Sequence, residues 1–165
     1  MCRNSLRHAA LATITALSLL SIQLVFAAAP TNACALLSQA QLADILGVEM
    51  DAGKNLVTAD DCRYSQQSAK PGADVALLQI NLTKAQSFEM GKTAIPNWTK
   101  TPLNGIGDDA YSADRGGKIT FPISPSLSVT KGSVSFVIAA KLPKATLEQT
   151  KDLEKKIAAA ILAKL

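Results

Sequence analysis

The chain has 165 residues, of which 48% are hydrophobic, and its 17 Lys and Arg against 13 Asp and Glu give a formal net charge of +4. This length and composition predict one domain of ordinary size that can bury a substantial core. A net charge this small does not indicate nucleic acid or an anionic membrane surface as a partner.

The first 27 residues have the pattern of a secretory signal peptide. Two arginines precede an apolar run over 11–26, and small residues at 27–29 follow it. The run is too short for a comfortable membrane span, so it predicts a signal peptide over 1–27 and a single exported domain over 28–165, periplasmic or secreted. A lipid anchor is not expected, because Cys34 lies eight residues beyond the apolar run.

Removal of this segment changes the chemistry available to the mature chain. It takes away two arginines, Cys2 and His8, which leaves a net charge of +2, two cysteines and no histidine. Without an imidazole, the mature chain cannot build a Ser-His-Asp or Cys-His nucleophile system within itself. Zinc sites with histidine ligands are excluded for the same reason.

Cys34 and Cys62 are the two cysteines of the mature chain. In an oxidising compartment two such cysteines usually pair, and the 29-residue loop between them corresponds to about 3.6 kcal/mol of stabilisation in the chain-entropy model. The alternative is a pair of buried thiols. A redox role is not indicated, because the two cysteines do not form a C-x-x-C motif.

The order of the predicted elements indicates an α+β domain. A compact helix is expected between a cap at Ser38 and a stop at Gly47, because Gln41 completes a capping box and glycine favours the helix C-cap. After it we expect strands over 62–66 and 75–83, a helix over 84–93, a long ordered loop over 95–107, strands over 110–113, 118–123, 127–130 and 134–142, and a final helix over 145–165.

These elements predict a mostly antiparallel sheet with an N-terminal helix, a middle helix and a long C-terminal helix packed on it. In the last helix, acidic residues offset the lysines, which favours a helix that covers the core over one that lies on a membrane. After removal of the signal peptide we expect a monomer that does not insert into a membrane.

The stretch from Gly105 to Ala110 has the outline G-x-G-x-x-A of a nucleotide-binding loop. That loop needs a strand directly before it and a helix directly after it, whereas here a proline-containing loop precedes and a strand-like pattern follows. Asp108 and Asp109 would also repel a phosphate. We therefore expect Gly105 and Gly107 to form a structural turn, with a positive φ at one of them or both.

Three further patterns do not predict sites. The stretch 91–93 resembles the end of a P-loop but lacks the glycine five residues upstream, and the S-x-x-K pattern at 128–131 leads into a hairpin, not a helix. Asp108, Asp109 and Asp114 could ligate calcium, but they do not have the EF-hand spacing. No cofactor and no metal are predicted.

Trp98 is the only tryptophan and lies in the predicted loop. Binding residues are common on ordered loops, so Trp98, Tyr111 and Arg115 are the candidate binding surface. The alternative for Trp98 is a lid on the core, since tryptophan is highly buried on average.

Four short motifs carry a resemblance to a known group of proteins. They are Cys34-Ala-Leu-Leu-Ser38, Leu46-Gly47, Cys62-Arg-Tyr64 and Gly105-Ile-Gly-Asp-Asp-Ala-Tyr111. Over most of 34–142 the chain resembles small exported bacterial domains of unknown function. These include actinobacterial secreted lipoproteins and the extracellular sensor-like domain of a mycobacterial receptor kinase. The chain lacks the lipid-anchor signal and the second disulfide of that group.

The resemblance implies a non-enzymatic envelope domain with a Cys34–Cys62 bridge and no catalytic residue. The leading hypothesis is therefore an exported ligand- or partner-binding, sensor-like module. One alternative is a small hydrolase or transferase built on carboxylates such as Asp108 and Asp109, which would need a cleft with convergent titratable groups. Another is a structural or inhibitor protein of the envelope that acts through a flat apolar surface.

Overall fold

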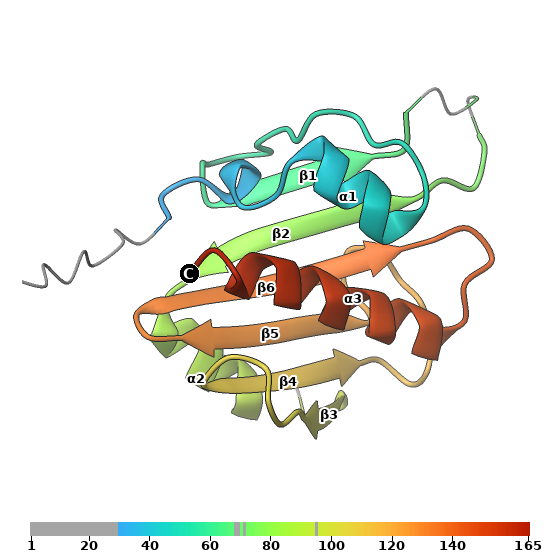
Figure 1. Cartoon of the computed structure of the whole chain (residues 1–165). Coiled ribbons are helices and arrows are strands. Elements are labelled where there is room, and N and C mark those ends of the chain that lie inside the picture. The colour runs from blue at the N-terminus through green and yellow to red at the C-terminus, as the bar shows by residue number, and fades with distance from the viewer. Residues whose placement is uncertain (1–29, 68–69, 71, 95) are drawn as a thin grey trace, which may run out of the picture.

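The computed structural model describes residues 30–67, 70, 72–94 and 96–165, so the predicted signal peptide lies outside the described residues. Six strands form one antiparallel sheet in the order β1-β2-β6-β5-β4-β3, with three α-helices on it (Figure 1). The predicted α+β class is confirmed. In chain order the elements are η1 (Ala33–Ala35), α1 (Gln39–Leu46), β1 (Asp61–Ser65), β2 (Leu77–Thr83), α2 (Ala85–Thr93), β3 (Thr99–Pro102), β4 (Asp109–Asp114), β5 (Ser126–Lys131), β6 (Val134–Lys141) and α3 (Leu147–Leu162).

The helices cover both faces of the sheet. In Figure 1, α1 and α3 lie in front of the sheet and α2 lies behind it. α3 packs against β5 and β6, and also contacts α1. Because side chains alternate along each strand, every second residue faces α1 and α3 and forms the main core. Its central members are Leu78, Ile80, Leu127, Val129, Phe136 and Ile138 from the strands and Leu153, Ile157 and Ile161 from α3.

Local sequence signals set the helix ends, as expected. Ser38 accepts a hydrogen bond from the backbone N–H of Gln41, whose side chain bonds back to Ser38, and Gly47 ends α1 with φ +69°. Thr146 and Gln149 form the same capping box at the start of α3. Both boxes satisfy backbone N–H groups that a helix start otherwise leaves unpaired.

A second, smaller hydrophobic cluster lies on the α2 side of the sheet. It contains Phe88 of α2 and Tyr111 and Ala113 of β4, with Trp98 packed against it. The rings of Phe88 and Tyr111 are 5.3 Å apart at an interplanar angle of 50°. Gly91 makes this packing possible, because a Cβ there would collide with the Tyr111 hydroxyl.

The predicted loop over 95–107 is wrong in part, because it contains the edge strand β3. β3 pairs with β4, from Thr99 opposite Asp114 to Pro102 opposite Tyr111. The strand has no apolar alternation, since it is short and mostly exposed at the edge of the sheet. Pro102 is tolerated at its end because an edge strand does not need every backbone N–H for pairing.

The predicted strand over 118–123 is also wrong. The connection from β4 to β5 has only isolated bridges, between Arg115 and Lys118 and between Thr120 and Ser124. The Ser124 hydroxyl accepts from the Arg115 N–H and donates to the Lys118 carbonyl, both at 2.9 Å. Proline at position 122 cannot donate to a ladder, so side-chain bonds hold this segment in place of strand pairing.

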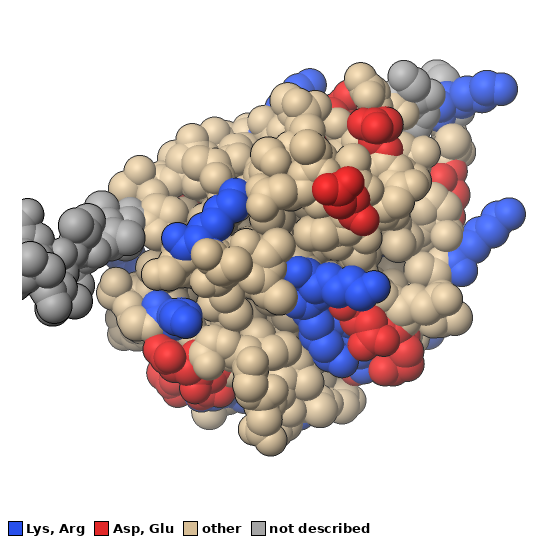
Figure 2. Space-filling view, in the orientation of Figure 1, with Lys and Arg blue, Asp and Glu red and all other residues tan. Residues whose placement is uncertain are grey.

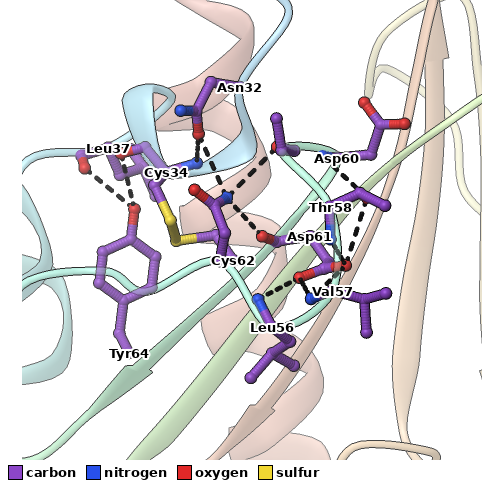
Figure 3. Close-up of a disulfide and its surroundings, with 12 residues drawn as sticks. Asn32, Cys34, Leu37, Leu56, Val57, Thr58, Asp60, Asp61, Cys62 and Tyr64 are labelled. Atoms are coloured by element: carbon purple, nitrogen blue, oxygen red, sulfur yellow. Dashed lines mark hydrogen bonds between the residues drawn. A yellow bond between two sulfur atoms is a disulfide. The ribbon is translucent and has the colours of Figure 1, made fainter.

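The disulfide between Cys34 and Cys62 is present, as predicted, with 5.0 Å between the two Cα atoms. It ties the 3-10 turn η1, which the sequence did not reveal, to β1 (Figure 3). The Tyr64 hydroxyl lies at 3.1 Å from both the Cys34 and Leu37 carbonyls, as hydrogen-bond donor. Burial raises the pKa of Tyr64 to about 12, so this donor keeps its proton at physiological pH.

The outer edge of β1 is paired with the segment that precedes it. Lys54 and Arg63 exchange two backbone hydrogen bonds of 3.0 and 2.9 Å, and the Asp51 N–H donates to the Ser65 carbonyl at 2.8 Å. Asp61 closes the intervening loop, because its carboxylate accepts the N–H groups of residues 56–58 (Figure 3). These backbone bonds lower the pKa of Asp61.

Candidate functional site

Of the three residues predicted to bind, the structure brings Tyr111 and Trp98 into one hydrophobic cluster and places Arg115 outside it. Tyr111 is only 8% exposed and belongs to the cluster on the α2 side of the sheet. Trp98 is half-buried and packs against the same cluster, which is the arrangement that a lid would have. Arg115 is exposed and lines a pocket. The part of the predicted surface that faces solvent is therefore centred on Arg115.

This pocket, which we name the Arg115 pocket, has a volume of about 490 Å³ and is lined by Asn97, Arg115, Gly116, Lys118 and Thr120. Two of its five lining residues are cations and none is acidic. Neither cation has a carboxylate within 4.0 Å among the residues that the structure describes. The lining therefore offers positive charge, an amide and a hydroxyl group to a ligand.

Two contacts fix the β4–β5 connection that carries Lys118 and Thr120. The Ser124 hydroxyl joins the backbones of Arg115 and Lys118, as described above. Beyond the pocket, the ring of Phe121 lies 5.6 Å from the guanidinium carbon of Arg63 on β1, a cation–π contact. The cations of the pocket thus lie on a segment that is held by the Ser124 hydroxyl and by the ring of Phe121.

Asp114 neighbours Arg115 in the chain but does not neutralise it. Its carboxylate pairs with Lys151 of α3 at 3.0 Å and accepts the Gly117 N–H at 3.1 Å. Burial acts to raise the pKa of Asp114, but the Gly117 N–H and the Lys151 ammonium outweigh it and hold the pKa below its usual value. Asp114 is therefore a charged anchor between the sheet and α3.

The acidic pair Asp108 and Asp109 does not converge on one site. The Asp108 carboxylate accepts the Gly132 N–H at 2.6 Å and so joins the β5–β6 hairpin. The Asp109 carboxylate pairs with Lys92 of α2. Within the described part of the chain, no group of three or more His, Cys, Asp or Glu side chains is arranged to hold a metal ion.

Gly105 and Gly107 both have positive φ, +76° and +61°, as the turn interpretation expects. They differ in their surroundings. A Cβ on Gly105 would have no atom within 4 Å, whereas one on Gly107 would lie 2.5 Å from the Thr130 carbonyl oxygen and 2.9 Å from Val129. The turn brings Asp108 into pairing distance of β5, where its N–H donates to Thr130 at 2.8 Å.

We expect the two glycines to respond differently to alanine. Gly105→Ala should lower the free energy of unfolding by about 1–2 kcal/mol, because of its positive φ alone. Gly107→Ala should lower it by roughly 2–3 kcal/mol, because the methyl group also overpacks against β5. Urea denaturation of both variants measures the difference. Equal losses would show that the contact with Thr130 is unimportant.

Figure 2 shows the face covered by α1 and α3. Lys and Arg side chains lie there beside Asp and Glu, and neither charge forms a continuous area in this view. No described helix combines the length and the apolar character needed to cross a bilayer.

Sequence reasoning named Arg115 but missed the other cation of the pocket. It placed Lys118 at the start of a strand, although the Gly-Gly pair before it signals a turn that brings positions 115 and 118 together.

Comparison of the chain with protein-family models, curated proteins and solved structures finds no match.

Proposed function

We propose that the protein is an exported, non-enzymatic module that binds an anionic ligand or partner in the cell envelope. The observation that carries the proposal is the Arg115 pocket, in which two cations lie with an amide and a hydroxyl group. Neither cation pairs with a carboxylate of the described residues. The Cys34–Cys62 bridge supports an oxidising compartment, where such bonds form and persist.

The chemistry of the lining favours a carboxylate or phosphate group. A guanidinium matches both geometrically, and a neighbouring ammonium adds charge without a fixed direction. The volume of about 490 Å³ lies within the range of small-molecule sites. An acidic segment of a partner protein would satisfy the same donors.

The carboxylate-enzyme alternative has less support. Its two candidate residues, Asp108 and Asp109, are engaged by Gly132 and Lys92 respectively and do not share a cleft. General acid–base chemistry needs groups that converge on one reacting atom.

Trp98 provides the test, because it is the only tryptophan and directly follows Asn97 of the pocket. We expect a saturable change in its fluorescence on titration with inorganic phosphate, citrate or a short acidic peptide. The double variant Arg115→Ala/Lys118→Ala should weaken binding by roughly tenfold or more.

The matched control removes two exposed lysines elsewhere, Lys84→Ala/Lys131→Ala, and should keep the affinity at constant ionic strength. Equal binding by wild type and by the Arg115/Lys118 variant would refute the proposed site. The absence of a saturable response to all three probes would refute the proposed ligand class.

A further inference from the structure

A second pocket of about 490 Å³ lies where the end of α1 meets α3 and the connection from β6 to α3. Its apolar side is formed by Ile45 of α1, Leu142 of the connection and Leu153 of α3. It shares no residue with the Arg115 pocket. We name it the Lys144 pocket, after the residue that distinguishes it.

Lys144 has an unusual backbone. Its φ is +57°, and no other residue apart from glycine has a positive φ among those that the structure describes. The Ala145 N–H donates to the Leu142 carbonyl at 3.3 Å, so Lys144 is the third residue of a four-residue turn with Pro143 second. A positive φ after proline is the pattern of a type II turn, where glycine or asparagine normally takes the third place.

The chain just before the turn is fixed by an ion pair, because Asp74 contacts Lys141 at 2.6 Å. Contact with Lys141, and to a lesser extent the charge of Lys144, hold the pKa of Asp74 below its usual value. A lysine here costs folding free energy that a glycine would not, and strain of this kind clusters at functional sites. The cost of a lysine at this position points to a role for its side chain.

The charges around the pocket favour an anion. Lys144 and Lys156 line it, and neither has a carboxylate within 4.0 Å among the described residues. The one acidic lining residue, Asp152, is paired with Lys155 at 2.9 Å. The lining thus combines two ammonium groups with the apolar side formed by Ile45, Leu142 and Leu153.

We infer that the Lys144 pocket binds an aliphatic carboxylate, with the hydrocarbon body on Ile45, Leu142 and Leu153 and the carboxylate between Lys144 and Lys156. An inorganic anion would leave the apolar side of the pocket exposed, and an uncharged alkyl chain would offer no negative charge to the two ammonium groups. Only a ligand with both parts uses the whole lining.

The test uses octanoate, observed through the methyl resonances of Ile45, Leu142 and Leu153. We expect saturable shifts with octanoate, weaker shifts with acetate, which lacks the body, and weaker shifts with octanol, which lacks the charge. Lys144→Gly should weaken octanoate binding by roughly tenfold or more. The same substitution should raise the melting temperature, because glycine relieves the positive φ.

Lys156→Ala should weaken octanoate binding as well. Its matched control is Lys131→Ala, which removes an exposed lysine that does not line the pocket. Octanoate affinity that is unchanged in both Lys144→Gly and Lys156→Ala would overturn the inference. Octanol binding as tight as octanoate binding would overturn it too. Because the readout is independent of Trp98, failure here leaves the Arg115 pocket unaffected.

Discussion

The free energy of unfolding is expected to fall by on the order of 4–5 kcal/mol as the pH rises from below about 4.5 to above about 8, because of Glu154. This side chain of α3 is fully buried against the sheet. One carboxyl oxygen accepts the Ala140 N–H at 3.1 Å, and the other has no hydrogen-bond partner in the described part of the chain. Burial raises the pKa to about 8, although the Ala140 N–H and Lys151 act to lower it.

The direction of the effect follows from the two protonation states. The folded protein favours the neutral carboxyl, whereas the unfolded chain ionises near the ordinary value of 4.5. The favourable contribution is therefore complete below that value and is lost progressively as the pH rises through the folded pKa.

Denaturation of wild type and Glu154→Gln across this pH range measures the contribution. The amide keeps an acceptor for Ala140 but cannot ionise, so the variant should lose the steep decline and be the more stable protein at alkaline pH. Asp152→Asn, an exposed neighbour on α3, is the control and should retain the wild-type profile. A decline of equal size in Glu154→Gln would assign it to another group.

Loss of the Cys34–Cys62 bridge should lower the free energy of unfolding by about 3–4 kcal/mol. The bridge closes a separation of 28 residues and holds η1 against β1. Without it, the carbonyls of Cys34 and Leu37 depend on the Tyr64 hydroxyl alone for their link to β1. Urea denaturation of Cys34→Ala/Cys62→Ala gives the loss directly, and in a chain without residues 1–27, which include Cys2, no free thiol is left to react.

The reductant supplies the control for this prediction. Dithiothreitol should destabilise the wild type to about the level of the double variant and leave the double variant unchanged. A wild type whose midpoint does not move after complete reduction, verified by thiol labelling, would show that the bridge contributes little.

The parts of the fold that local chemistry determines were predictable. The two ends of α1 are set by contacts within a few residues, at Ser38, Gln41 and Gly47. The alternating apolar residues over 75–83 mark β2. The errors involve partners that lie six to fifteen residues away, beyond the reach of the local patterns. β3 has no apolar alternation and exists because β4 offers it an edge, and the segment after Arg115 is shaped by the Ser124 hydroxyl in place of a ladder.

The candidate sites depend on distant packing even more. The pattern around Tyr111 shows a strand, but it does not reveal that α2 brings Phe88 over the ring and removes it from the surface. The Leu-Pro-Lys-Ala sequence at 142–145 contains no glycine, so nothing in it signals a positive φ at Lys144. The pocket that Lys144 lines also needs Ile45 of α1 and Leu153 of α3, which meet this turn only in the folded chain.

The two margins of the sheet have a consequence for association between copies of the protein. An open strand can template pairing with another chain and so start aggregation. At β1 the segment around Lys54 already occupies the outer hydrogen-bonding positions. At β3 the strand is four residues long, carries Lys100 and ends in Pro102. Both margins therefore resist the addition of a further strand and limit edge-to-edge association between copies of this domain.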